Sequence, residues 1–407
     1  MKTSPNHLPS LFGSLLFIFA ALLFLSAALL VGVTTLSTAF TGNGVPARQT
    51  IIMIVAAVEG LILLVATVIS IQKFLQKESA DKDSSFSISV LQIVASLVVI
   101  GAAIWIGDSF SENTYLNWAV LPILTIPAVI LPIFIILGLG IRKLPLGPRW
   151  QSWNVFGVGM TLTPFLLVFV EVFAFILILV FVIVYVVSQP SLILEMERLT
   201  RQMNGLDPQS TAARELLLPW ITRPAVLVLA MIYVSLMVPL VEELFKPLGV
   251  WLFSRRLTSR AQGFALGALS GAAYALIETL GVSPQTTGWA DLLLTRIGTD
   301  ILHVTTSALM GAAIVSAIQG RKYLQLLGTY ILSVSLHGLW NALAILFTFS
   351  ALADLADTPN VLAGKQLPLS ISMGVLAALF LVILLVSNRR MRSIAVPAPS
   401  EEINTKI

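Results

Sequence analysis

Apolar residues in this chain gather into long runs that are separated by shorter polar segments. A helix of about 20 apolar residues can cross the roughly 30 Å hydrocarbon layer of a bilayer. Ten runs reach that length, near residues 11–33, 50–72, 87–107, 116–141, 153–187, 226–253, 263–282, 298–319, 324–350 and 367–388. The pattern therefore predicts an all-α polytopic membrane protein of about ten transmembrane helices. The fifth run exceeds one crossing, so we expect it to tilt or to project from the membrane.

Charged residues between the runs predict how the helices are oriented. Lysine and arginine concentrate on the cytoplasmic side of membrane proteins. With the N-terminus placed in the cytoplasm, 16 of these residues fall in inside segments, 7 (including Arg296) fall in outside segments, and Lys246 lies within a run. The alternation predicts a multi-pass protein of the cell membrane with both termini in the cytoplasm. The first run is too long for a cleaved signal peptide, so we expect it to remain as a helix.

Composition narrows the chemistry open to this chain. Hydrophobic residues make up 57% and charged residues 11% of the 407 residues, whereas soluble domains carry about 25% charged residues. The absence of cysteine excludes disulfides, thiolate zinc sites and cysteine catalysis. Of the three histidines, His7 lies in a polar tail, so imidazole chemistry depends on His303 and His337. The net charge of +4 is modest, and we expect no nucleic-acid partner.

Residues 189–223 form the only sizeable polar insert between two runs. Their pattern predicts two short amphipathic helices that are broken at Asn204 and Gly205. The predicted topology places this insert outside the cytoplasm, on the membrane surface. Two roles stay open: an ordinary surface connection, or a gate that contacts substrate.

Three charged residues, Glu242, Glu243 and Lys246, lie in the middle of the sixth run. A charge at the centre of a membrane helix costs roughly 2.5–3.5 kcal/mol, whereas a leucine or valine returns only about 0.3–0.6 kcal/mol. Glu242 and Lys246 are four residues apart, so they share a helix face and can pair. The remaining acid must find a partner on another helix, keep a proton or face water.

The next three runs carry the polar groups that such a partner requires. Glu278 follows Tyr274 by four residues in the seventh run, and His303 lies near the start of the eighth. His337 and Asn341 share one face of the ninth run. We therefore expect an active-site four-helix bundle in the C-terminal half, built around one polar cavity. Small residues in these runs permit close packing: Gly267, Ser270, Gly271, Ala272, Ser307 and Gly311.

Two classes of function stay open from the residues alone. Carboxylates and imidazoles together can activate water for hydrolysis. Two histidines and a glutamate are also a common zinc ligand set, whereas without a metal histidine and asparagine would stabilise an oxyanion. The alternative is a proton-coupled membrane transporter or channel, in which Glu59, Glu171 and the later glutamates relay protons. Transporters usually have two similar halves, but here the polar residues concentrate in one half.

The order of these residues resembles the PrsW family of intramembrane proteases, within the superfamily of CAAX prenyl proteases and bacteriocin-processing proteins. The resemblance covers about residues 225–350. It implies an intramembrane endopeptidase whose partners are the lipid bilayer and a membrane protein or peptide substrate, such as an anti-sigma factor. The matching motifs are Glu242-Glu243-x-x-Lys246, Tyr274-x-x-x-Glu278, His303 and His337-x-x-x-Asn341.

The resemblance also implies roles for the acidic and basic residues. One of Glu242 and Glu243 would activate water, and the other would pair with Lys246. Glu278 and His303 would complete the site. If the enzyme uses a metal, the resemblance implies zinc bound by Glu278, His303 and His337.

On the other side of the site, His337 and Asn341 would hold the oxyanion. An amide is a poor ligand for a hard dication, which favours this role for Asn341. The sequence departs from the family at Asn341, where aspartate is frequent, and at Tyr274, where phenylalanine is more usual.

These predictions divide the chain into four parts. Residues 1–188 form transmembrane helices without an assigned role, 189–223 the extracytoplasmic insert, 224–350 the PrsW-like catalytic helix bundle, and 351–407 the last transmembrane helix and a basic cytoplasmic tail. Counting residues along the helices places the polar groups between the midplane and the outer leaflet. We therefore expect the cavity to open to the extracytoplasmic side.

Overall fold

The computed structural model describes residues 7–42, 44–207, 210–355 and 362–395, and every regular element in these ranges is a helix. Within the described ranges, ten helical segments are long and apolar enough to cross a membrane. This confirms the predicted all-α fold with about ten transmembrane helices. The chain is therefore a multi-pass membrane protein.

The helices divide between two compact units. Unit 1 comprises Met1–Pro164, Lys246–Tyr330 and Leu379–Ile407, and unit 2 comprises Phe165–Phe245 and Ile331–Ala378. These boundaries differ from those of the four predicted parts, because helices that are distant in sequence pack together. The helices of the predicted four-helix bundle are divided between the units, so that bundle stays a prediction.

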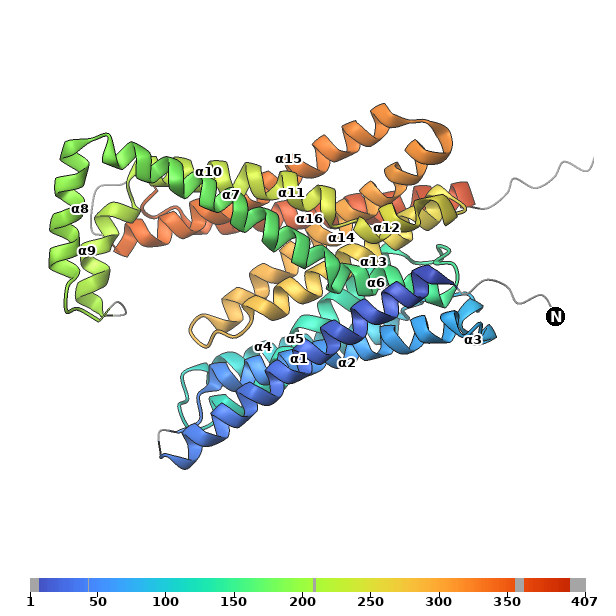
Figure 1. Cartoon of the computed structure of the whole chain (residues 1–407), viewed down its shortest axis with the longest axis horizontal. Helices are drawn as coiled ribbons and strands as arrows, with labels where there is room; N and C mark the ends of the chain where they lie inside the picture. Colours follow the sequence, from blue (N-terminus) through green and yellow to red (C-terminus); the bar gives the residue numbers. More distant parts are fainter. Residues whose placement is uncertain (1–6, 43, 208–209, 356–361, 396–407) are drawn as a thin grey trace, which may run out of the picture. The chain divides into compact units, whose positions relative to one another are not determined.

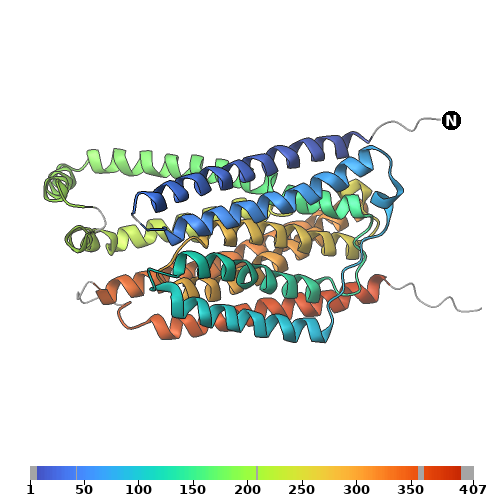
Figure 2. The ribbon, with the colours of Figure 1, turned by 90° about the horizontal axis from the view of Figure 1, so that it is seen from below.

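Unit 1 is organised around two helix pairs. Figures 1 and 2 show α1 beside α2, and α13 beside α14. α13 also contacts α5 and α6, so helices from the first half of the chain support the pair that carries Glu278 and His303. The helices of unit 1 are α1 (Leu8–Phe40), α2 (Ala47–Phe74), α3 (Glu78–Asp81), α4 (Val90–Ser111), α5 (Asn117–Gly140), α6 (Arg149–Met160), α12 (Leu248–Phe253), η2 (Ser254–Arg256), α13 (Arg260–Val282) and α14 (Trp289–Gly320).

Unit 2 contains the polar insert and the first part of the sixth crossing, up to Phe245. Two helices form in the insert, and Gly205 between them has a φ of 86°, which glycine adopts at little cost. The location of the insert outside the cytoplasm stays a prediction. The elements of unit 2 are α8 (Pro190–Met203), α9 (Thr211–Ile221), α10 (Pro224–Ile232), the π-helical turn η1 (Tyr233–Met237) and α11 (Val238–Phe245). Three helices have residues in both units: α7 (Leu162–Val187), α15 (Tyr323–Leu355) and α16 (Gln366–Ala395).

The fifth apolar run forms two helices rather than one tilted helix. Thr161, between α6 and α7, has a φ of −122° and a ψ of −77°, outside the helical region. Pro164 has no N–H to donate to the carbonyl of Met160, which interrupts the helical hydrogen bonds at this point. Most residues of α6 are buried, whereas α7 carries many exposed apolar side chains, as contact with lipid requires.

Small residues let α13 and α14 approach closely, as the sequence predicts. A methyl group added to Gly267 would overlap the backbone of Ser307. A methyl group added to Gly271 would overlap the carbonyl of His303. The backbone that carries His303 is therefore held directly against α13.

Gly267→Ala should lower the thermal stability of the protein in detergent, whereas Gly281→Ala on the same helix should not. The methyl group at Gly267 would meet backbone atoms that cannot move independently, and such overpacking costs about 1–3 kcal/mol. Nothing lies within 4 Å of a methyl group at Gly281, where alanine has the better helix propensity. Equal unfolding midpoints for the two variants would contradict the close approach of α13 and α14.

Candidate active site

The sixth crossing is interrupted where α15 contacts it. Pro239, the second residue of α11, has no N–H to donate to the carbonyl of Ser235. The π-helical turn η1 ends just before α11, so the regular α-helix is interrupted here. Gly338 of α15 lies against that carbonyl, because a methyl group on Gly338 would overlap it. Asn341, one turn later, donates from Nδ2 to the carbonyl of Val234 at 2.8 Å. Both contacts hold α15 against the sixth crossing within unit 2.

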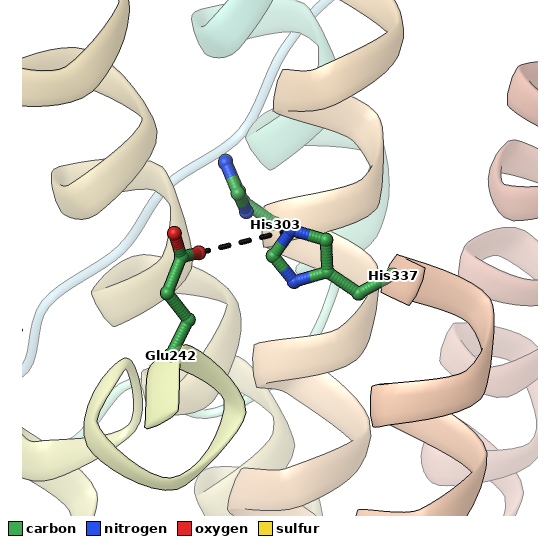
Figure 3. A group of neighbouring side chains, drawn as sticks. All are labelled: Glu242, His303 and His337. Atoms are coloured by element: carbon green, nitrogen blue, oxygen red, sulfur yellow. Dashed lines mark ion pairs between the residues drawn. The ribbon is translucent and has the colours of Figure 1, made fainter. Parts of the chain in front are cut away.

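These contacts place His337 beside the paired glutamates of α11. Nδ1–H of His337 donates to Oε1 of Glu243 at 2.8 Å. Nε2 of His337 lies 3.8 Å from Oε2 of Glu242, the contact that is dashed in Figure 3. All three side chains are buried, with Glu243 0%, His337 2% and Glu242 5% exposed. One imidazole therefore has a different carboxylate at each of its two nitrogens.

Lys246 follows directly after α11 and belongs to unit 1, where it is fully buried. Its Nζ donates to Nδ1 of His303 at 2.9 Å, and its backbone carbonyl accepts from Oγ of Ser270 at 2.6 Å. The ring of His303 packs edge-on against Tyr274, with 5.1 Å between the ring centroids. The sequence predicts a glutamate of the same run as the partner of Lys246. The structure adds His303, a partner that helical spacing cannot predict.

Glu278 connects His303 to a second group of polar residues. Nε2–H of His303 donates to Oε2 of Glu278 at 2.6 Å, and Arg296 lies 2.8 Å from the same oxygen. Thr279 donates to Asp300 at 2.8 Å and accepts from Nε of Arg296 at 3.0 Å. Arg296 precedes the predicted eighth run, but α14 begins at Trp289 and therefore includes it. Asp300 follows Arg296 by four residues, and His303 follows Asp300 by three. This spacing indicates that the three residues share one helix face.

The hydrogen bonds assign the proton on each imidazole. Lys246 can only donate, so Nδ1 of His303 accepts and its Nε2–H donates to Glu278. Glu243 accepts from Nδ1–H of His337, which leaves the lone pair of that imidazole on Nε2. Each histidine thus has a carboxylate at its protonated nitrogen. Carboxylates in this position orient histidines that ligate metals.

Two of the predicted site residues have contacts that differ from their predicted roles. The oxygens of Glu278 accept hydrogen bonds from His303 and Arg296, which favours a supporting role over the predicted ligand role. Asn341 donates to a backbone carbonyl, which favours a positioning role over the predicted oxyanion role. The remaining predicted residues all belong to the two hydrogen-bonded groups, one in each unit.

Comparisons with known proteins agree with this chemistry. No curated protein and no solved structure matches the chain. The family model described as PrsW family intramembrane metalloprotease matches residues 147–385. The matched region includes α10 to α15 and therefore every residue of the two hydrogen-bonded groups. Because the match covers more than half of the 407 residues, the chain belongs to the PrsW family of intramembrane metalloproteases.

Proposed function

We propose that Glu242, His303 and His337 together form the metal centre at which this membrane-embedded protease cleaves its substrate. The observation that carries the proposal is that each histidine donates a hydrogen bond to a carboxylate: His337 to Glu243, and His303 to Glu278. Each contact leaves the other nitrogen of a buried imidazole unprotonated. On His303 that nitrogen accepts from Lys246, which a bound metal would displace. Buried imidazoles and a carboxylate are the ligand types that a catalytic metal needs. Glu242 thus replaces Glu278 in the ligand set that the resemblance implied.

The side chains of the proposed centre fit zinc. Two imidazoles and one carboxylate, with a position left for water, are a common catalytic zinc set. Nε2 of His337 and Oε2 of Glu242 are 3.8 Å apart, close to the roughly 3.4 Å between two ligands of one tetrahedral zinc ion. A bound divalent ion would supply Lewis-acid polarisation of the scissile carbonyl.

The residues of the chain itself would perform the remaining steps. Glu242 would accept the proton of the attacking water on the oxygen that does not bind the metal, and would later return it to the leaving amine. Glu243 and Glu278 would hold the two imidazoles in the required tautomer and orientation. Lys246 is buried, and its Nζ would donate a hydrogen bond to the oxyanion of the tetrahedral intermediate.

The substrate of an intramembrane protease is a membrane protein in the lipid bilayer. We infer that it is a protein or peptide with one membrane segment, of the kind that an anti-sigma factor exemplifies. With both termini of the protease in the cytoplasm, the centre would open to the extracytoplasmic side. Cleavage would then fall near the outer end of the membrane segment of the substrate. Membership of a protease family favours this function over the proton-coupled transporter.

A membrane-anchored peptide should be cleaved roughly 10²-fold faster by the reconstituted protein than the same peptide without its anchor. The anchor confines substrate and enzyme to one bilayer and so raises their effective concentration. Mass spectrometry of the products gives both the rate and the cleaved bond. The Glu242→Gln protein in matched vesicles serves as the blank. Equal rates for the two peptides, or cleavage at the cytoplasmic end, would contradict the proposed substrate class or orientation.

A further inference from the structure

A polar pocket lies in unit 1 where three connections between helices meet, away from the residues of the candidate active site. The connections are residues 82–89, residues 141–148 and the segment from η2 to the start of α13. The pocket has a volume of about 580 Å³. Its rim is fixed because the backbone N–H of Ser84 donates to the carbonyl of Gly147 at 2.7 Å. Its polar lining includes Asp83, Ser84, Gln151, Arg256, Thr258 and Gln262.

Gln151 lines this pocket and has an unsatisfied hydrogen-bond donor. The backbone N–H and the hydroxyl of Thr258 both donate to Oε1 of Gln262, so Nε2 of Gln262 must face Gln151. That Nε2 donates to Oε1 of Gln151 at 3.1 Å, which fixes the orientation of the second carboxamide as well. Nε2 of Gln151 has no hydrogen-bond partner among the described residues, although the side chain is only 2% exposed. A buried donor of this kind is costly unless a ligand accepts from it.

The connections around the pocket carry a net positive charge, although the lining itself holds one acid, Asp83, as well as Arg256. Arg256 lines it and donates to Nε2 of His7, and its guanidinium lies 5.8 Å from the ring of Trp150. Burial, together with the nearby charges of Arg256 and Lys73, lowers the pKa of His7, so the imidazole is neutral and accepts this hydrogen bond. Residues 73–86, 141–149 and 254–260 together hold nine lysines and arginines against three acids. The first turn of α6, which begins at the pocket, adds a partial positive charge.

An apolar pocket of about 320 Å³ adjoins the polar one and shares Ser84 and Leu146 with it. It is bounded by the end of α5, by the first turns of α6 and by the middle of α13. Leu269 of α13 lies roughly 13 Å along the helix axis from Arg260, at the charged start of the helix. If Arg260 lies at the membrane surface, Leu269 is at the depth of the lipid acyl chains. The apolar lining includes Phe86, Leu137, Ile141, Trp153, Phe156 and Leu269.

We propose that these two adjoining pockets bind one anionic phospholipid. Its phosphate would accept hydrogen bonds from Gln151 and Arg256, and the upper part of one acyl chain would lie in the apolar pocket. A lipid suits this site better than a soluble phosphate because the polar and apolar pockets adjoin in a membrane-spanning unit. The site is separate from the metal centre and does not depend on the proposed cleavage mechanism.

Native mass spectrometry of the full chain, released from phosphatidylcholine vesicles that contain phosphatidylglycerol, tests this proposal. One phosphatidylglycerol molecule should stay bound in preference to phosphatidylcholine. Arg256→Gln should weaken its retention roughly tenfold or more, as the loss of a charge-assisted hydrogen bond does. Arg255→Gln removes the same charge from a neighbouring residue that does not line the pocket, so it should have little effect. Gln151→Glu should weaken retention as well, because a carboxylate repels the phosphate.

Two further arms separate a lipid from a free phosphate. Leu269→Trp fills the apolar pocket and should displace the lipid, and an excess of inorganic phosphate should not displace it. Arg256 is exposed, so its variant should fold normally even if the Gln151 variant does not. Equal losses of phosphatidylglycerol retention in Arg256→Gln and Arg255→Gln would show that general surface charge holds the lipid, which would overturn the proposal. Equal retention of phosphatidylcholine, displacement by inorganic phosphate, or no effect of Leu269→Trp would overturn it too.

Discussion

Glu242→Gln should lower the rate of peptide cleavage by the reconstituted protein about 10²-fold or more and should remove its bound metal. The amide cannot accept a proton from water, and general-base catalysis alone contributes roughly 10²–10⁴-fold. It is also a poorer ligand than a carboxylate, so the metal content of the purified protein should fall. Cleavage rate and elemental analysis of the same preparation measure both effects.

Glu59→Gln is the matched control for this experiment. Glu59 is a buried glutamate of a membrane helix, 4% exposed on α2, and no site role is proposed for it. Its amide variant should keep both activity and metal. Full activity in Glu242→Gln would contradict the role of Glu242. A similar loss in Glu59→Gln would show that removing any buried carboxylate lowers cleavage and would contradict a specific role for Glu242.

Glu243→Gln and Glu278→Gln should each weaken metal affinity and activity roughly 10–100-fold without abolishing them. Each variant keeps a side chain of the same size beside an imidazole but removes the charge that orients and polarises it. Losses of this size are typical when a carboxylate that supports a metal-ligating histidine is changed. Titration of the metal-free protein with zinc, followed by a cleavage assay at saturating zinc, separates the loss of affinity from the loss of rate.

This pair of variants also discriminates between the two ligand sets. If Glu278 were a ligand, Glu278→Gln would release the metal, and Glu242→Gln would retain it. The present assignment expects the opposite order. Glu278→Gln also leaves Arg296, whose side chain is 12% exposed, with a weaker partner. The comparison is therefore made at equal folded fraction, measured by thermal unfolding.

The sequence by itself determines which segments cross the membrane and which residues are chemically unusual. Transfer of about 20 apolar residues into lipid is a local and nearly additive property, so the ten spans follow from hydropathy. A charged group in such a span is costly enough to require an explanation, which is why Glu242, Glu243 and Lys246 are conspicuous without any structure. The small residues on α13 and α14 likewise predict the close contact that holds His303.

Only the tertiary structure decides which polar groups meet and through which atoms. Glu243 and Glu278 look equivalent to Glu242 in sequence, but each accepts a hydrogen bond from a different imidazole. Glu243 accepts from His337, 94 residues away, and Glu278 accepts from His303, 25 residues away. The pairing of Arg296 with Glu278 also depends on contacts between helices. Helical periodicity describes one helix at a time, whereas side-chain conformation and tautomer are set by contacts between helices. For that reason the sequence indicates candidate site residues, and the fold determines which of them contact one another.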